Sequence, residues 1–93
     1  MKNIPDKLHV LIEVQDREIY EPWMYIAYED AVTKMEQLFK QALGINEITE
    51  EFLDESSGTY AFFNPEGGYA WANDIHGAHF DWKILLIKTA DIQ

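Results

Sequence analysis

The sequence contains no cysteine. Disulfide bonds, thiolate nucleophiles and cysteine-ligated metals are therefore excluded for this chain. Long apolar runs are also missing, since no window approaches the roughly 18 apolar residues of a membrane span. The first six residues lack the apolar stretch of a signal peptide. We expect a cytoplasmic protein held together by non-covalent packing.

Basic residues are scarce and unevenly placed. The chain has 7 Lys and Arg against 17 Asp and Glu, which gives a formal net charge of -10. No basic residue lies between Lys40 and Lys83, an interval that holds these carboxylates: Glu47, Glu50, Glu51, Asp54, Glu55, Glu66, Asp74 and Asp81. Such a surface repels phosphate backbones and anionic headgroups. Direct binding to nucleic acid or membrane is disfavoured, and a basic protein partner is favoured.

Apolar residues are nevertheless abundant. Hydrophobic residues make up 47% of the chain and aromatic residues 14%, which is too apolar for a disordered acidic tail. At this length we expect one folded domain spanning residues 1–93. So short a domain buries only about 60–65% of the surface that its unfolded chain exposes, so a homodimer or a complex is an open alternative to a monomer.

The first half of the chain has patterns typical of two strands followed by a helix. Residues 8–14 are β-favouring, which predicts a strand buried on at least one face. Residues 19–28 resume this composition, and Pro22, which lacks a backbone N–H, predicts a bulge or an edge in that second strand. Apolar spacings of three and four predict a helix over residues 29–43, ended by Gly44.

The second half predicts a short helix and three further strands. Residues 47–55 are expected to form a helix whose carboxylates make an acidic ridge. A turn rich in Asn, Pro and Gly separates residues 59–63 from 69–73, which predicts a hairpin. Residues 79–88 alternate and then become fully apolar, which suits a more central strand. The order β-β-α-(α)-β-β-β predicts an α+β fold, with an antiparallel sheet of about four to five strands packed against the main helix.

The sharpest cluster of chemically active side chains is Asp74, His76, His79 and Asp81. Neutral imidazole and carboxylate oxygen together suit zinc, nickel or iron, so a divalent metal site is one interpretation. Turns favour Asp, Gly and His for backbone reasons alone. We therefore expect surface turn residues here and no bound metal.

The predicted acidic helix brings carboxylates into pairs, such as Glu50 with Asp54 and Glu51 with Glu55. General acid–base catalysis also needs an enclosed cleft that separates two pKa values, and this segment is expected to be solvated. We expect a solvated or protein-binding face, with no enzymatic activity and no cofactor. The aromatic residues are numerous enough that some tyrosine and tryptophan side chains are expected to anchor an interface.

In its size, negative charge and lack of cysteine, the chain resembles the small acidic phage-encoded anti-defence proteins, including anti-CRISPR proteins and DNA mimics. The resemblance is one of type across the whole chain, because those proteins share no single fold or motif. It implies an inhibitor that works in the host cytoplasm and covers a basic, nucleic-acid-binding surface of a target nuclease complex. The residues expected to contact that surface are Glu47, Glu50, Glu51, Asp54 and Glu55, with Glu66 and Asp74 second.

Other functions fit the same sequence. An immunity protein or antitoxin that neutralises a basic nuclease toxin needs almost the same acidic surface. A small metal- or ligand-binding protein would use the turn that carries His76 and His79, and would have a pocket there. A structural or accessory domain, such as a homodimeric phage component, is also compatible with the charge.

Overall fold

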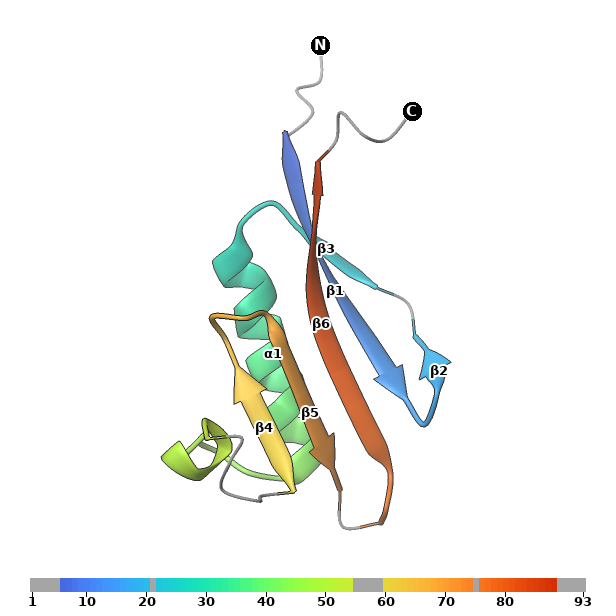
Figure 1. Ribbon diagram of the computed structural model, residues 1–93, viewed down its shortest axis with the longest axis vertical. Coiled ribbons are helices and arrows are strands. Elements are labelled where there is room, and N and C mark those ends of the chain that lie inside the picture. Colours follow the sequence, from blue (N-terminus) through green and yellow to red (C-terminus); the bar gives the residue numbers. More distant parts are fainter. Residues whose placement is uncertain (1–5, 21, 55–59, 75, 89–93) are drawn as a thin grey trace.

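The computed structural model describes residues 6–20, 22–54, 60–74 and 76–88. Within these residues, an antiparallel sheet of six strands is covered on one face by a single α-helix, α1 (Tyr28–Leu43) (Figure 1). The α+β class is therefore confirmed. The other elements are β1 (Lys7–Gln15), β2 (Glu18–Ile19), β3 (Trp23–Tyr25), the 3-10 turn η1 (Glu50–Phe52), β4 (Ala61–Asn64), β5 (Tyr69–Asn73) and β6 (His79–Lys88).

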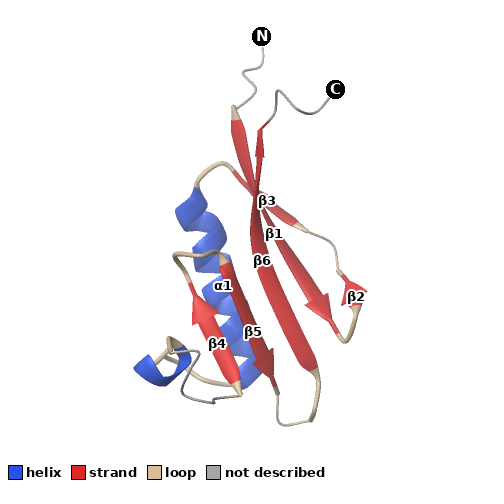
Figure 2. Cartoon of the chain, in the orientation of Figure 1, coloured by secondary structure: helices blue, strands red, loops and turns tan. Residues whose placement is uncertain are grey.

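The sheet is built around its two longest strands. Its order is β2-β1-β6-β5-β4, and β3 also pairs with β1. β1 and β6 pair over their whole common length, from Lys7 opposite Lys88 to Gln15 opposite Phe80. The strand predicted over residues 79–88 is thus central, as its apolar run indicated. Figure 2 shows the two strands running past α1 toward the chain termini.

The second predicted strand is divided in two. β2 and β3 both pair with β1, but the pairing is interrupted between Ile19 and Trp23. Pro22 lies in this interruption and is exposed. Proline has no N–H to contribute to a strand ladder, and the edge position that Pro22 predicted is confirmed, because β2 and β3 each pair only with β1 among the described strands. This division raises the strand count above the expected four to five. β1 turns into β2 through Asp16 and Arg17, which both have positive φ angles of 49° and 75°.

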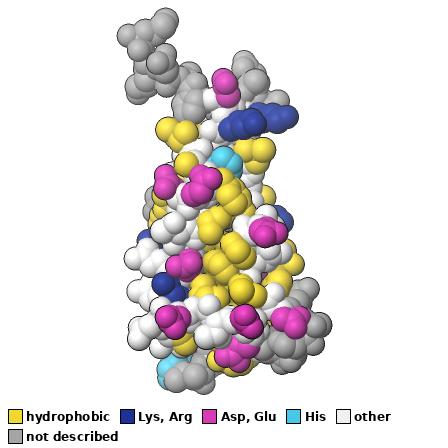
Figure 3. Space-filling model, turned by 90° about the vertical axis from the view of Figure 1, so that its left-hand side faces the viewer, with side chains coloured by type: hydrophobic (Ala, Val, Ile, Leu, Met, Phe, Trp, Pro, Cys, Tyr) yellow, Lys and Arg dark blue, Asp and Glu magenta, His cyan; other side chains and the backbone are white. Residues whose placement is uncertain are grey.

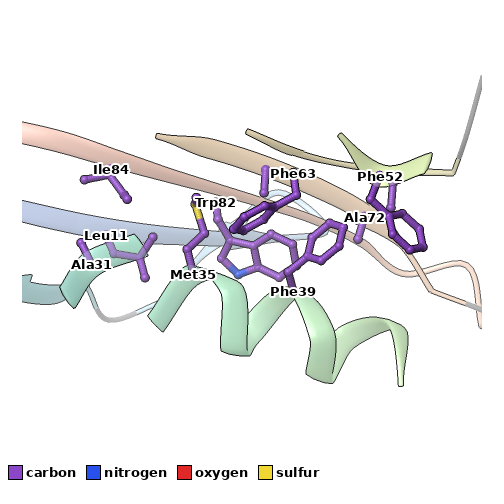
Figure 4. Packing of buried hydrophobic residues seen from close by; sticks show 11 residues of the cluster. Leu11, Ala31, Met35, Phe39, Phe52, Phe63, Ala72, Trp82 and Ile84 are labelled. Carbon is purple, nitrogen blue, oxygen red and sulfur yellow. The ribbon is translucent and has the colours of Figure 1, made fainter. Parts of the chain in front are cut away.

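The helix predicted over residues 29–43 is confirmed with one residue added at its start. Ala31, Met35 and Phe39 recur every four residues, so they lie on one helical face and all three are fully buried. Gly44 ends the helix in the left-handed region at φ 66°. Figure 4 shows this face meeting side chains from the sheet, where the Phe39 ring contacts those of Phe63 and Trp82.

The acidic helix predicted over residues 47–55 is wrong in form. Only Glu50–Phe52 is helical, as one 3-10 turn, and Thr49 before it is extended. Like charges three and four residues apart disfavour an isolated helix, and so short a helix is marginal in water. Tertiary packing decides the conformation instead, because the buried Phe52 ring packs edge-on against Phe39.

The hairpin predicted in the second half is confirmed as β4 and β5, paired from Ala61 opposite Ala72 to Asn64 opposite Tyr69. Its turn is held by Asn64, which accepts a hydrogen bond at its side chain from the N–H of Gly67 and at its carbonyl from the N–H of Gly68. β4 forms one edge of the sheet. Glu55, one of the residues predicted to contact a partner, lies outside the described residues.

Candidate protein-binding surface

Three hollows follow one another along the side of the molecule formed by α1, η1 and the edge strand β4. The first, of about 600 Å³, lies between α1 and the segment leading into η1. The second, of about 330 Å³, lies along β4, and the third, of about 370 Å³, lies between the start of α1 and the β4–β5 turn. Leu53 lines both the first and the second, and Pro65 and Glu66 line both the second and the third. The hollows therefore form one continuous surface.

We call this surface the acidic band. Its charged and apolar members are Tyr28, Glu29, Val32, Glu36, Lys40, Glu47, Ile48, Glu50, Leu53, Phe62, Phe63, Pro65 and Glu66. Figure 3 looks onto this side and shows hydrophobic side chains running along the long axis of the molecule, with acidic side chains on both sides. Leu53 is 49% exposed, so apolar surface lies directly at the solvent.

Carboxylates dominate the charge of the acidic band. Five of them, namely Glu29, Glu36, Glu47, Glu50 and Glu66, line the hollows together with one ammonium, that of Lys40. The Lys40 ammonium lies 3.3 Å from the Glu36 carboxylate, four residues earlier on α1. Five negative charges and one positive charge leave a formal charge of -4. The band is thus suited to cationic groups, with a local lysine already neutralised.

The lower end of the band is presented by the segment around η1. Glu47 and Glu50 are exposed, while Ile48 between them packs against the core cluster. The Thr49 hydroxyl donates a 3.2 Å hydrogen bond to the carboxylate of Glu51. Apolar anchors therefore hold this acidic segment, with its single 3-10 turn, in place. Of the residues predicted to contact a partner, Glu47, Glu50, Glu51 and Asp54 belong to this segment, and Glu47 and Glu50 line the band.

The upper end of the band joins Glu66 to the start of α1. The Tyr28 hydroxyl donates a hydrogen bond to the backbone carbonyl of Pro65, which fixes the β4–β5 turn beside the helix. Burial and the nearby Glu66 carboxylate raise the pKa of Tyr28 above its ordinary value. Glu66 is therefore in the same band as Glu47 and Glu50, although at its opposite end.

Asp74 is not part of the band. It lines a separate pocket of about 480 Å³ at the end of α1, together with Tyr60, Asn73 and His76. Its carboxylate accepts hydrogen bonds of 2.8 Å from the backbone N–H groups of His76 and Ala78. These bonds give Asp74 a role in shaping the β5–β6 turn, and its grouping with the other partner-binding candidates stays a prediction.

The two histidines of this turn lie in different surroundings. His76 is exposed beside the pocket. His79 lies at the start of β6, stacked on the Trp71 ring, with its Nδ1 2.7 Å from the Asn73 side-chain oxygen and its Nε2 3.0 Å from the Asp81 carboxylate. Among the described residues, no three His, Asp or Glu side chains come together in a group that could hold a metal ion.

Sequence reasoning missed the part of the band that α1 supplies, namely Glu29, Val32 and Glu36. Glu29 and Glu36 lie on exposed positions of a helix whose buried face was identified correctly. The polar face opposite to that buried face was the available signal. The acidic interval after Lys40 pointed instead to residues 47–55.

No helix in the described part of the chain combines the length and the apolar character needed to cross a membrane. Comparison of the chain with protein-family models, with curated proteins and with solved structures gave no match. The surface chemistry of the molecule itself is therefore the basis for assigning a function.

Proposed function

We propose that this protein binds a basic surface of a partner protein through the acidic band, and that it thereby covers a site at which the partner binds nucleic acid. The observation that supports this function is the continuity of the band, in which an apolar strip that includes the half-exposed Leu53 is lined by five carboxylates and a single, already paired lysine. A basic partner is the complement of that arrangement.

The apolar strip and the carboxylates have different parts in such a complex. Apolar anchors that lose their contact with water contribute most of the binding free energy of a typical interface, and Leu53 is the exposed side chain placed to do so. Surrounding carboxylates speed the encounter with a cationic surface and set its orientation. The complex should therefore form quickly at low salt, and its affinity should fall as the salt concentration rises.

A nucleic-acid-binding protein is the class of partner that this charge favours. Such proteins hold phosphates with clustered Lys and Arg side chains, which are also the groups that Glu47, Glu50 and Glu66 can pair with. An inhibitor of a nuclease complex and an immunity protein against a nuclease toxin would both use this surface. The anti-defence role is our proposal because it also accords with the resemblance in size and composition.

The experiment immobilises the chain and exposes it to a nuclease-treated lysate of a candidate host, at low and at high salt. The wild-type chain is expected to retain a basic nucleic-acid-binding protein and to release it at high salt. Glu50→Lys should lose most of that protein. Glu18→Lys on β2 is the control, because it changes the net charge equally at an exposed residue outside the acidic band. Equal retention by both variants would show that net charge, and not the band, is responsible.

A further inference from the structure

The face of the sheet opposite to α1 is also apolar, and Figure 1 looks onto it. Because side chains alternate along a strand, this open face receives Val10, Ile12 and Val14 from β1, and their cross-strand neighbours Met24 and Leu85. Met24 is 64% exposed and Leu85 37%. An apolar sheet face of this kind marks a site of protein contact.

The open face has a buried residue of its own, Val10, outside the main core. Val10 is only 6% exposed, yet it does not belong to the core cluster between α1 and the sheet. Its cross-strand partners are Met24 on one side and Leu85 on the other, which share its face. The open face is thus a second, shallow apolar cluster, and no described element covers it as α1 covers the other face.

The open face is electrically neutral in a strongly acidic chain. Among the described strand residues, its fixed charges are Asp81 and Lys83, which have opposite signs and lie two residues apart on β6. The Lys83 ammonium lies 5.9 Å from the centre of the Tyr69 ring on the same face. A neutral face can meet a second copy of itself without the repulsion that two chains of charge -10 meet elsewhere.

The size of the open face is close to what a stable dimer needs. The nine paired residues on each of β1 and β6, the five of β5, and the two of β2 with the three of β3, at about 3.3 Å along and about 4.8 Å across the strands, give roughly 450 Å² in flat projection. Side chains that project from the sheet add to this accessible area. A standard stable interface buries about 800 Å² on each partner, so the face is of the appropriate order.

We infer that two copies of this chain associate through their open faces as a sheet-on-sheet dimer. Sheets that pack in this way meet about 10 Å apart with their strands crossed by about 30°. The carboxylates of the acidic band lie on α1, on the segment around η1 and on the β4–β5 turn, all outside the open face, so the dimer would present two acidic bands. The partner here is a second copy of the chain, and the inference does not depend on the proposed function.

Light scattering after size-exclusion chromatography tests the dimer with the full chain at about 100 μM. The expected mass is twice the 10.9 kDa of one chain. Leu85→Glu should raise the dissociation constant of the dimer at least about tenfold. Leu86→Glu is the matched control, since Leu86 is 52% exposed on the same strand but on the other face, and this variant should remain dimeric.

A monomeric wild-type chain, or equal dissociation by both leucine variants, would overturn the dimer. Circular dichroism shows whether each variant is folded. If Leu85→Glu does not fold, Met24→Glu provides a second test at a more exposed residue of the open face.

Discussion

The indole N–H of Trp82 donates a hydrogen bond of 2.7 Å to the carboxylate of Glu13, the residue directly opposite it on β1. Trp82 is only 2% exposed, so Glu13 satisfies a buried donor within the sheet. Glu13→Ala should lower the free energy of unfolding by about 1–3 kcal/mol, because it leaves that donor without an acceptor. Glu13→Gln keeps an acceptor oxygen and should lose less in urea denaturation. Equal losses in the two variants would show that the hydrogen bond is unimportant.

Phe39 is the centre of the aromatic core, where its ring contacts those of Phe52, Phe63 and Trp82. Phe39→Ala should destabilise the fold by about 3–5 kcal/mol, since it removes buried surface and leaves a cavity. Leu53→Ala, at a half-exposed residue, should change stability far less. Thermal unfolding followed by circular dichroism measures both. A small effect of Phe39→Ala would contradict the packing of α1 on the sheet.

Gly68 and Gly77 both have a backbone conformation that favours glycine, but only Gly68 is also crowded by neighbouring atoms. Both have positive φ, of 71° and 86°, so alanine is strained at either position. A Cβ at Gly68 would lie 3.1 Å from the Tyr28 hydroxyl oxygen and 3.4 Å from the Cβ of Ile84, whereas one at Gly77 meets nothing within 4 Å. Gly68→Ala should therefore be more destabilising than Gly77→Ala. Equal midpoints in chemical denaturation would contradict the close approach of the turn to α1.

Tyr28 should make stability depend on alkaline pH. Burial and the Glu66 carboxylate raise its pKa in the folded state. Above about pH 10 the unfolded chain loses the tyrosine proton while the folded chain retains it, so the free energy of unfolding falls as pH rises through the folded pKa. Ionisation also removes the donor of the hydrogen bond to Pro65.

Urea denaturation between pH 8 and 11 checks this effect of Tyr28. Tyr28→Phe should lose part of the alkaline decrease in stability, and Glu66→Gln should reduce it by a smaller amount. Identical pH profiles for the wild-type chain and Tyr28→Phe would contradict the assignment.

The parts of the fold that depend on local patterns were predicted from the sequence. Ala31, Met35 and Phe39 identified the helix by spacing alone, and Pro22 identified an edge strand, although not its division in two. The segment around η1 was mispredicted because Ile48 and Phe52 have helical spacing, although their positions are determined by contacts with the core. Spacing cannot distinguish these two causes of the same pattern.

The candidate site was predicted in part. The interval without basic residues identified Glu47, Glu50 and Glu66 as candidate contact residues. Their arrangement in one band depends on β4 lying beside α1, and this joins residues that are 38 positions apart, such as Tyr28 and Glu66. The open face was not predicted, because Leu85 and Leu86 look alike in the sequence and only strand pairing assigns them to opposite faces.

The most direct test of the central claim uses a purified basic partner and a fluorescent nucleic acid that it binds. The wild-type chain should displace the nucleic acid in an anisotropy titration, and Glu50→Lys should need at least about tenfold more protein, equivalent to about 1.4 kcal/mol. Glu18→Lys should match the wild type. A stable complex that leaves the nucleic acid bound, or equal displacement by Glu50→Lys, would contradict the claim that the acidic band covers the nucleic-acid site.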